Sequence, residues 1–341
     1  MLVTQHPVFR RFWYPVVPIA QIQHGSAAFE LLGQRLVIWQ AAEGQPVAVA
    51  DRCCHRSARL SQGTVVDGAI QCPYHGWCFD GQGRCVQVPQ VPDRPISPAY
   101  QVPGYACVER YGYAWVCLDS PLADIPDIPE AVDPQFRYIP QFYEPWRCAG
   151  LRLMENSFDN AHPHFVHHKT FGISQEPVPP PPTSLEEMDW GLTMTYGLPV
   201  KNSDMQKQNL GMESDRTLRL SRATWYLPFL RTLRITYPNG LVHLIFTAAT
   251  PVNDQVSQIV QFCLRNDTEA DAPAQDIIAF DRAVTLEDKD ILEGTDYDVP
   301  LDLHAEQHMW TDQPGIIMRR KLAHLIQRAE APAIALSSAT L

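Results

Sequence analysis

Two short segments decide how the first third of the chain is interpreted: CCH at Cys53–His55 and, sixteen residues further on, CPYHGW at Cys72–Trp77. Two cysteines and two histidines in closely spaced pairs can hold a tetrahedral zinc ion. The same residue types can hold a [2Fe–2S] cluster in which two imidazoles replace two thiolates on one iron. The spacing alone leaves both metal centres open.

A second cluster of possible ligands lies near the middle of the chain, where ENSFDNAHPHFVHH (Glu155–His168) packs four histidines into seven positions. In a helix, His164 and His168 share one face at spacing i,i+4. The five residues from His162 to His167 turn an ideal helix by about 500°, which separates the side chains by roughly 140°. A proline at 163 can break the helix, so both pairings remain possible.

Two imidazoles alone do not complete a metal site, and a carboxylate is a common further ligand. A late acidic segment, residues 281–293, offers candidates: Asp281, Glu287, Asp288, Asp290 and Glu293.

Length and proline distribution predict the domain organisation. The 341 residues are typical of about two domains, and prolines punctuate residues 119–146 so often that we expect no helix or long strand there. We therefore predict an α+β protein with domains at 1–120 and 146–341 and a proline-rich connection at 121–145. The first domain is expected to be antiparallel β, with strands at 35–40, 47–50, 69–74, 84–88, 105–109 and 113–118 and a Tyr111-Gly112 turn.

The second domain is expected to combine helices with a central antiparallel sheet. Its predicted helices cover 151–168, 274–293 and 316–329, and its predicted strands cover 218–227, 232–237, 241–250 and 257–265. The prolines at 177–182 predict a surface loop of polyproline type.

Charge and hydropathy exclude several classes of function. The net charge of −11 argues against a nucleic-acid partner, and no stretch is long and apolar enough for a membrane span. The first residues lack the order of a secretory signal, so we expect a cytoplasmic protein. Its nine cysteines then serve as thiols or metal ligands rather than as disulfides.

The two cysteine and histidine segments, with a GQG turn at 81–83, closely resemble the cluster loops of Rieske proteins. The resemblance implies that Cys53 and Cys72 hold one iron and that His55 and His75 hold the other. High-potential Rieske proteins have cysteine and serine where this chain has Tyr74 and Trp77, which implies fewer hydrogen bonds to the sulfurs and a lower potential.

The pattern Asn156-x-x-Asp159-x-x-His162-x4-His167 resembles the mononuclear iron motif of Rieske non-haem iron oxygenases, in the homotrimeric branch of monooxygenases and demethylases. The resemblance implies that His162 and His167 bind Fe(II). The segment EDKDILE (287–293) is similar to the late acidic segment of that family. It implies Asp288 as the carboxylate ligand, with Asp290 as the alternative, and it leaves His164 and His168 outside the ligand set.

The same resemblance gives roles to two further residues and to an assembly. Asp159 matches a carboxylate that links His75 of one subunit to His162 of the next in a head-to-tail trimer, and Asn156 matches a position beside the iron. The expected function is a terminal oxygenase that hydroxylates or O/N-dealkylates a cyclic organic substrate with O2. The alternatives are a ring cis-dihydroxylating dioxygenase and a Rieske electron-transfer protein without oxygenase activity.

Electrons must come from a partner, because the chain contains no G-x-G-x-x-G dinucleotide-binding motif. We expect a separate ferredoxin or flavin reductase. Three arginines around the first cluster segment, Arg52, Arg56 and Arg59, offer an acidic ferredoxin a basic docking spot.

Overall fold

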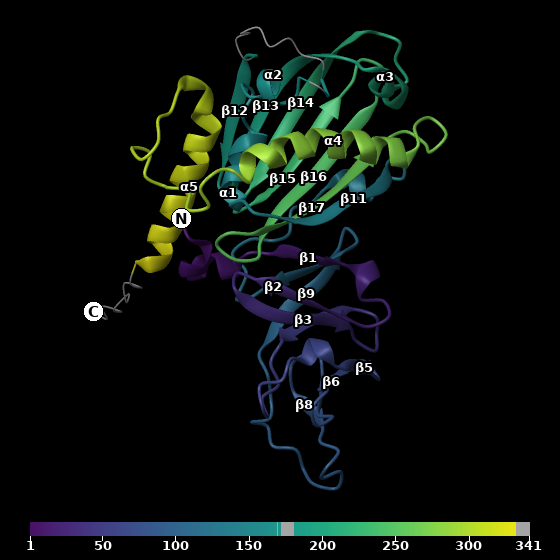
Figure 1. Ribbon diagram of the computed structural model, residues 1–341, viewed down its shortest axis with the longest axis vertical. Coiled ribbons are helices and arrows are strands. Elements are labelled where there is room, and N and C mark those ends of the chain that lie inside the picture. Colours follow the sequence, from purple (N-terminus) through teal and green to yellow (C-terminus); the bar gives the residue numbers. More distant parts are fainter. Residues whose placement is uncertain (169, 172–180, 332–341) are drawn as a thin grey trace, which may run out of the picture.

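Two antiparallel sheets, one from each part of the chain, determine the shape of the molecule (Figure 1). The computed structural model describes residues 1–168, 170–171 and 181–331. The N-terminal third forms a six-stranded sheet and, at one end of the long axis, a small four-stranded sheet. The remainder forms a seven-stranded sheet with helices against it. The predicted α+β fold, a β domain followed by a sheet flanked by helices, is confirmed.

The small sheet is an insertion between two neighbouring strands of the six-stranded sheet, β4 and β9. The larger sheet has the order β1-β10-β9-β4-β3-β2, and the smaller has the order β5-β6-β7-β8. The strand bounds are β1 Tyr14–Pro18, β2 Ser26–Leu31, β3 Gln34–Gln40, β4 Pro46–Ala50, β5 Thr64–Val66, β6 Ala69–Gln71, β7 Cys78–Phe79, β8 Cys85–Gln87, β9 Gly104–Arg110 and β10 Tyr113–Cys117.

The strands predicted in this domain are present, with one change of length. The strand expected at 69–74 ends at Gln71, because Cys72 begins a loop that folds back on itself. Tyr111 and Gly112 both adopt positive φ angles, 53° and 75°. This is the geometry of a tight two-residue hairpin turn, and it joins β9 to β10 as predicted.

The expectation that no long strand crosses the proline-rich connection is wrong. Strand β11 runs from Arg137 to Trp146 and contains Pro140 and Pro145. Proline lacks an N–H donor, but an edge strand can spare that donor on its open side. β11 is the edge strand of the seven-stranded sheet, and its register shifts between Pro140 and Phe142. The strand therefore belongs to the second sheet, and the irregular connection ends before residue 137.

The seven-stranded sheet is a continuous antiparallel meander apart from its first strand. Its order is β11-β17-β16-β15-β14-β13-β12. The four predicted strands correspond to β14–β17, whereas β12 and β13 were not predicted. The bounds are β12 Thr183–Met188, β13 Gly191–Lys201, β14 Arg216–Tyr226, β15 Leu230–Thr236, β16 Val242–Pro251 and β17 Ser257–Arg265.

The helices lie on one side of this sheet, with α4 running across it (Figure 1). The continuous helix expected at 151–168 is wrong. α1 ends at Ser157, and α2 begins only at Pro163, because proline suits the first turn of a helix but not its interior. The helix bounds are α1 Gly150–Ser157, α2 Pro163–Val166, α3 Asp204–Leu210, α4 Ala274–Leu292 and α5 Gln313–Glu330. Short 3-10 helices are η1 Val3–Gln5, η2 Pro7–Arg11, η3 Ile19–Gln21, η4 Leu60–Gln62, η5 Pro129–Ala131 and η6 Trp310–Asp312.

The opposite face of the seven-stranded sheet packs against the N-terminal domain. Trp115 of β10 contacts Phe246 of β16, with ring centroids 5.9 Å apart, and Phe246 stacks on Phe262 of β17 at 4.8 Å. All three rings are fully buried. Because the two sheets share this core, the two domains of the chain are held in a fixed position relative to each other.

Two further sequence predictions concern membrane-spanning helices and the proline-rich loop at 177–182. The helices in the described residues include none that is both long and apolar enough to cross a bilayer. Most of the polyproline-type loop expected at 177–182 lies outside the described residues, since the description resumes at 181.

Candidate active site

Two loops of matching construction bring Cys53, His55, Cys72 and His75 together at the end of the N-terminal domain. In the first loop, the Cys53 N–H donates to Ala58 (2.8 Å) and the Cys53 carbonyl accepts from Ser57 (3.0 Å). In the second loop, Cys72 makes the same two bonds to Trp77 and Gly76, at 2.8 and 3.0 Å. Ser57 and Gly76 occupy the same step of the turn, and both have positive φ angles, 61° and 72°.

The side chains in these loops suit a metal cluster. Cys53 and Cys72 are each only 2% exposed, and the rings of His55 and His75 lie 4.5 Å apart. Burial, with the neighbouring Cys72 thiol, raises the pKa of Cys53 to about 11. Deprotonation of Cys53 near neutral pH is therefore favoured by a nearby cation. The Nδ1 atom of His55 is buried and has no hydrogen-bond partner. Trp77 stacks on the His55 ring at 4.6 Å and restricts its orientation.

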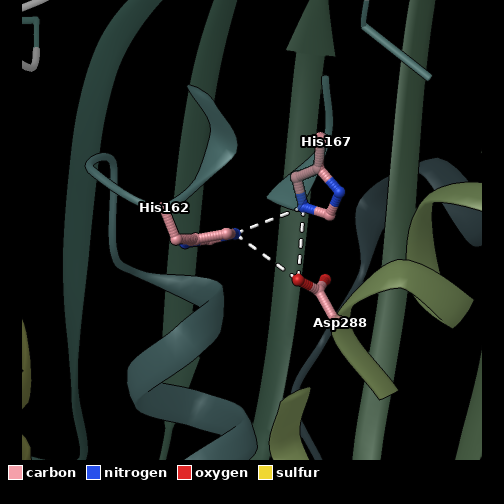
Figure 2. A group of neighbouring side chains, drawn as sticks. All are labelled: His162, His167 and Asp288. Carbon is pink, nitrogen blue, oxygen red and sulfur yellow. Dashed lines mark hydrogen bonds and ion pairs between the residues drawn. The ribbon is translucent and has the colours of Figure 1, made fainter. Parts of the chain in front are cut away.

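A second group of donors forms where the break between α1 and α2 meets α4. His162 lies just before α2, His167 lies just after it, and Asp288 projects from α4 (Figure 2). The Nε2 atoms of the two histidines are 3.2 Å apart, and the Oδ1 atom of Asp288 lies 3.5 Å from His162 Nε2 and 3.2 Å from His167 Nε2. Oδ1 is buried and accepts no hydrogen bond of good geometry. Two imidazoles and one carboxylate facing one point are the donors of a facial iron triad.

The helix break explains why this pair of histidines converges. The five-residue spacing brings His162 and His167 together because α2 is a single short turn that begins at Pro163. His164 is buried but belongs to no group of convergent donors among the described residues. The Nδ1 atom of His168 bonds the Phe165 carbonyl at 2.9 Å. The alternative i,i+4 pair is therefore not assembled, and Asp290, the alternative carboxylate, is exposed.

Glu287, which the sequence placed only among the general acidic candidates, orients one of these histidines. Its Oε2 lies 3.0 Å from His167 Nδ1 and also accepts from Thr170 Oγ1 at 2.8 Å. Although burial opposes the change, the neighbouring carboxylates of Asp288 and Glu287 raise the pKa of His167 above its usual value. A carboxylate on Nδ1 fixes the tautomer that leaves Nε2 free to bind a metal. Its position beside Asp288 in the sequence is the signal that could have identified it.

Asp159 and Asn156 lie beside the donor group. Asp159 Oδ2 lies 3.4 Å from His162 Nδ1, and Oδ1 accepts from the Ala161 N–H. Against the effect of burial, these contacts lower the pKa of Asp159. Its side chain is still 34% exposed, so it can be reached from outside. Asn156 lies beside Asp288 and contributes to the lowered pKa of that carboxyl.

A partly open cavity of about 140 Å³ lies beside the donor group. Its floor is one face of the seven-stranded sheet, because alternate residues of β13–β17 point into it. A chain of hydrogen bonds crosses this floor from Thr247 through Gln261 (2.9 Å) and Gln141 (2.6 Å) to Asp281. Asp281 also lies 3.1 Å from His243 Nε2.

A further possible donor group consists of His243, Cys263 and Asp281. The Nε2 atom of His243 is buried near Asp281 and makes no hydrogen bond of good geometry with the described residues. The Gln141 amide donates to both Asp281 and Cys263. Burial raises the pKa of Cys263 well above its usual value, which keeps the thiol protonated. Of these three residues, His243 and Asp281 line the cavity.

The chain matches two family models that together cover most of its length. Residues 12–106 match the Rieske [2Fe–2S] domain, and residues 146–328 match the vanillate O-demethylase oxygenase C-terminal domain. An iron–sulfur domain joined to a sheet with a two-histidine, one-carboxylate group defines an oxygenase, which is an oxidoreductase. Within that class, the chain belongs to the Rieske non-haem iron oxygenases of the vanillate O-demethylase type. These enzymes use a [2Fe–2S] cluster and a mononuclear iron, and they take electrons from a separate ferredoxin or reductase.

Characterised relatives agree with this assignment. The methylxanthine N1-demethylase NdmA of Pseudomonas putida is 30% identical over 97% of this chain and 93% of its own length. The N3-demethylase NdmB of the same organism is 27% identical over 94% of this chain and 90% of its own. The structure of NdmA with caffeine superposes with a TM-score of 0.81, at 29% identity over 94% and 93% of the two chains. Dicamba monooxygenase, 22% identical over 95% and 99%, shows the same fold with a TM-score of 0.79.

Proposed function

We propose that this protein is the terminal oxygenase of a monooxygenase system that removes an N- or O-methyl group from a cyclic substrate or hydroxylates it. The observation that carries the proposal is the convergence of His162, His167 and Asp288 at the wall of a cavity. An electron carrier would need only the N-terminal domain, so this second site argues against that alternative. The similarity to two demethylases favours dealkylation over ring cis-dihydroxylation.

The residue roles follow from the two groups of donors. Cys53, His55, Cys72 and His75 would hold the [2Fe–2S] cluster, and His162, His167 and Asp288 would hold the mononuclear iron. The bound metals would supply electron storage and O2 activation. Glu287 holds His167 in its ligand tautomer, Asn156 supports Asp288, and the cavity keeps the substrate beside the iron and away from bulk water.

The wide separation of the two candidate metal sites within one chain supports a head-to-tail trimer. The cluster loops lie with the small sheet at one end of the long axis, whereas α2 lies at the other (Figure 1). The shared core prevents one chain from closing this separation. A neighbouring chain can bring its cluster loops to the exposed side of Asp159, which then links His75 of one subunit to His162 of the next.

The electron donor would dock at the cluster end of the molecule. Arg52, Arg56 and Arg59 are all exposed around the first cluster loop, and they form a basic spot on a protein of net charge −11. An acidic ferredoxin domain is complementary to that spot. Such an electron donor must be reduced again by cellular reductants after each transfer. We therefore propose that the enzyme is cytoplasmic.

Iron counting combined with oxygen uptake tests the proposal. The purified protein should hold three irons per chain, two with Rieske absorbance, and Asp288→Ala should lose only the third iron. Cys72→Ala should abolish the absorbance. Asp290→Ala, on the same helix but exposed, is the matched control and should keep all three.

With a surrogate reductase, turnover of a methylated substrate should consume one O2 for each formaldehyde released. Two irons per chain in the wild type would instead indicate an electron carrier. Loss of the third iron from Asp290→Ala and not from Asp288→Ala would contradict the ligand assignment. A cis-diol product without formaldehyde would establish the dioxygenase.

A further inference from the structure

Five aromatic side chains form a continuous row across the cluster end of the molecule. The ring centroids of neighbours in this row are 3.9 Å apart for Tyr74 and His75, 4.5 Å for His75 and His55, 4.6 Å for His55 and Trp77, and 4.9 Å for Trp77 and Tyr100. Both ends of the row reach the surface, since Tyr74 is 65% exposed and Tyr100 is 41% exposed. The row therefore joins two separate points of the surface through the two histidines of the proposed cluster site.

The Tyr74 end of the row belongs to the side that faces the neighbouring chain. In the proposed trimer, Asp159 of the next subunit meets His75, and the Tyr74 ring lies directly against His75. A neighbouring chain at His75 therefore covers this end, where electrons leave. The Tyr100 end, on the far side of His55, is left for a protein that delivers electrons.

Positive charge lies with the loop that carries His55 and not with the loop that carries His75. Three exposed arginines fall within residues 52–59, and one of them, Arg56, directly follows His55. Residues 60–83, which include the whole second loop, contain no lysine or arginine. An acidic partner is therefore steered toward the His55 half of the row.

The ring of Tyr100 is carried by a fixed backbone. Its N–H donates to the Ser97 carbonyl at 2.9 Å, and its carbonyl accepts from the N–H of Cys85, in β8, at 2.8 Å. The ring packs on Trp77, which in turn lies within 6° of parallel to the His55 ring. A rigid, exposed aromatic ring offers a partner contact area at a low cost in conformational entropy, and aromatic residues often dominate the binding energy of an interface.

The row also shortens the gap that an electron must cross. Electron tunnelling slows steeply as the distance between two redox centres grows. A donor that packs on Tyr100 and Trp77 places its own centre next to rings that are in contact with His55. In each transfer the donor is oxidised by one electron and the cluster site is reduced by one, with no covalent bond formed or broken.

We propose that Tyr100 and Trp77, with Arg56, form the surface on which an acidic [2Fe–2S] ferredoxin domain docks, and that electrons enter the cluster site there by way of His55. The inference rests on the proposed function for the presence of a donor at the cluster end, and it adds the face and the residues that receive it. The two cluster histidines then have different tasks, because His55 receives the electron and His75 passes it on.

Binding and reduction by an acidic plant-type [2Fe–2S] ferredoxin test the inference on the holoenzyme without O2. Calorimetry gives the Kd of the oxidised proteins, and the Rieske absorbance in a stopped-flow instrument gives the rate of reduction by the reduced ferredoxin. Tyr100→Ala should raise the Kd and lower the second-order rate constant about 10-fold, as expected for loss of an aromatic contact at the centre of an interface. Tyr100→Phe keeps the ring and should behave like the wild type.

Tyr74→Ala is the matched control, because it removes the exposed ring at the other end of the row. It should leave both the Kd and the rate of reduction unchanged. Dithionite needs no docking surface and should reduce Tyr100→Ala as fast as the wild type, which shows that the cluster is intact. Arg56→Gln, an exposed surface change, should lower the rate of reduction by ferredoxin about 2- to 5-fold at low salt and should have no effect at high salt.

Four results would overturn the inference. They are no binding of the ferredoxin to the wild type at low salt, a Kd and rate in folded Tyr100→Ala equal to those of the wild type, slower reduction in Tyr74→Ala instead, and an unchanged rate in Arg56→Gln at low salt. The measurements on the wild type and on Arg56→Gln remain decisive if Tyr100→Ala loses its Rieske absorbance.

Oxygen uptake separates this inference from the proposed function. Uptake and product formation with a chemical reductant, together with normal reduction of Tyr100→Ala by ferredoxin, would overturn the entry surface and leave the oxygenase in place. Reduction by ferredoxin that depends on Tyr100, without oxygen uptake on any methylated substrate, would support the entry surface and contradict the proposed function.

Discussion

Replacing Glu287 by glutamine should weaken iron binding at a residue that is not itself a proposed ligand. The Glu287 carboxylate accepts two hydrogen bonds, from His167 Nδ1 at 3.0 Å and from Thr170 Oγ1 at 2.8 Å. Hydrogen bonds to a charged group contribute about 1 kcal/mol more than neutral ones. Glu287→Gln removes the charge from both, which amounts to about 2 kcal/mol, or roughly 30-fold in Fe(II) affinity at about 1.4 kcal/mol per decade.

Competition with a chelator of known affinity measures this effect directly. The iron that remains is counted at equilibrium, and the Rieske absorbance in the same sample reports whether the distant cluster is intact. Asp290→Asn makes the matching change to an exposed carboxylate on the same helix and should bind iron like the wild type. If Glu287→Gln holds its third iron as tightly as that control, the carboxylate does not set the orientation or basicity of His167.

Three further variants test other contacts. Asp159→Asn should keep all three irons but slow reoxidation of the reduced cluster by O2 and substrate roughly 10–100-fold in single turnover; reoxidation at the parent rate would exclude the proposed route through Asp159. Arg319→Met leaves the buried Glu155 short of one partner and should lower the free energy of unfolding by about 3 kcal/mol in urea, with partial recovery on adding Glu155→Leu. Despite burial, hydrogen bonds from Arg265 and a second arginine lower the pKa of Asp267. The ionised Asp267 carboxylate therefore stabilises the folded state above pH ~4, and this stabilisation is lost as the pH falls further. The Tm difference between wild type and Asp267→Asn should therefore be constant from about pH 8 to pH 5 and shrink below pH ~4; a constant difference at low pH would contradict this linkage.

Local patterns predicted the elements whose residues alternate clearly or lie between strong turn signals. β14–β17 are long runs separated by short connections, and the Tyr111-Gly112 turn needed only local backbone geometry. The prediction failed where tertiary context decides. β11 tolerates Pro140 and Pro145 because it is an edge strand, and a single sequence does not show which strand lies at the edge.

The site residues divide in a similar way. The spacing of the motifs left alternatives open, and the family resemblance selected the cluster loops, the pair His162 and His167, and Asp288. Glu287 was not singled out, because its role depends on a contact across 120 residues.

The prolines at two sheet edges affect how copies of this chain can approach one another. β1 and β11 are edge strands with two prolines each, Pro15 and Pro18 in β1 and Pro140 and Pro145 in β11. Each proline removes a donor that an incoming strand would need, so these edges resist the backbone pairing that starts aggregation. Association at these edges must then depend on side chains and loops, whose complementarity is specific to the correct partner. Copies of this chain are thus protected from joining one another through the open backbone of these two strands.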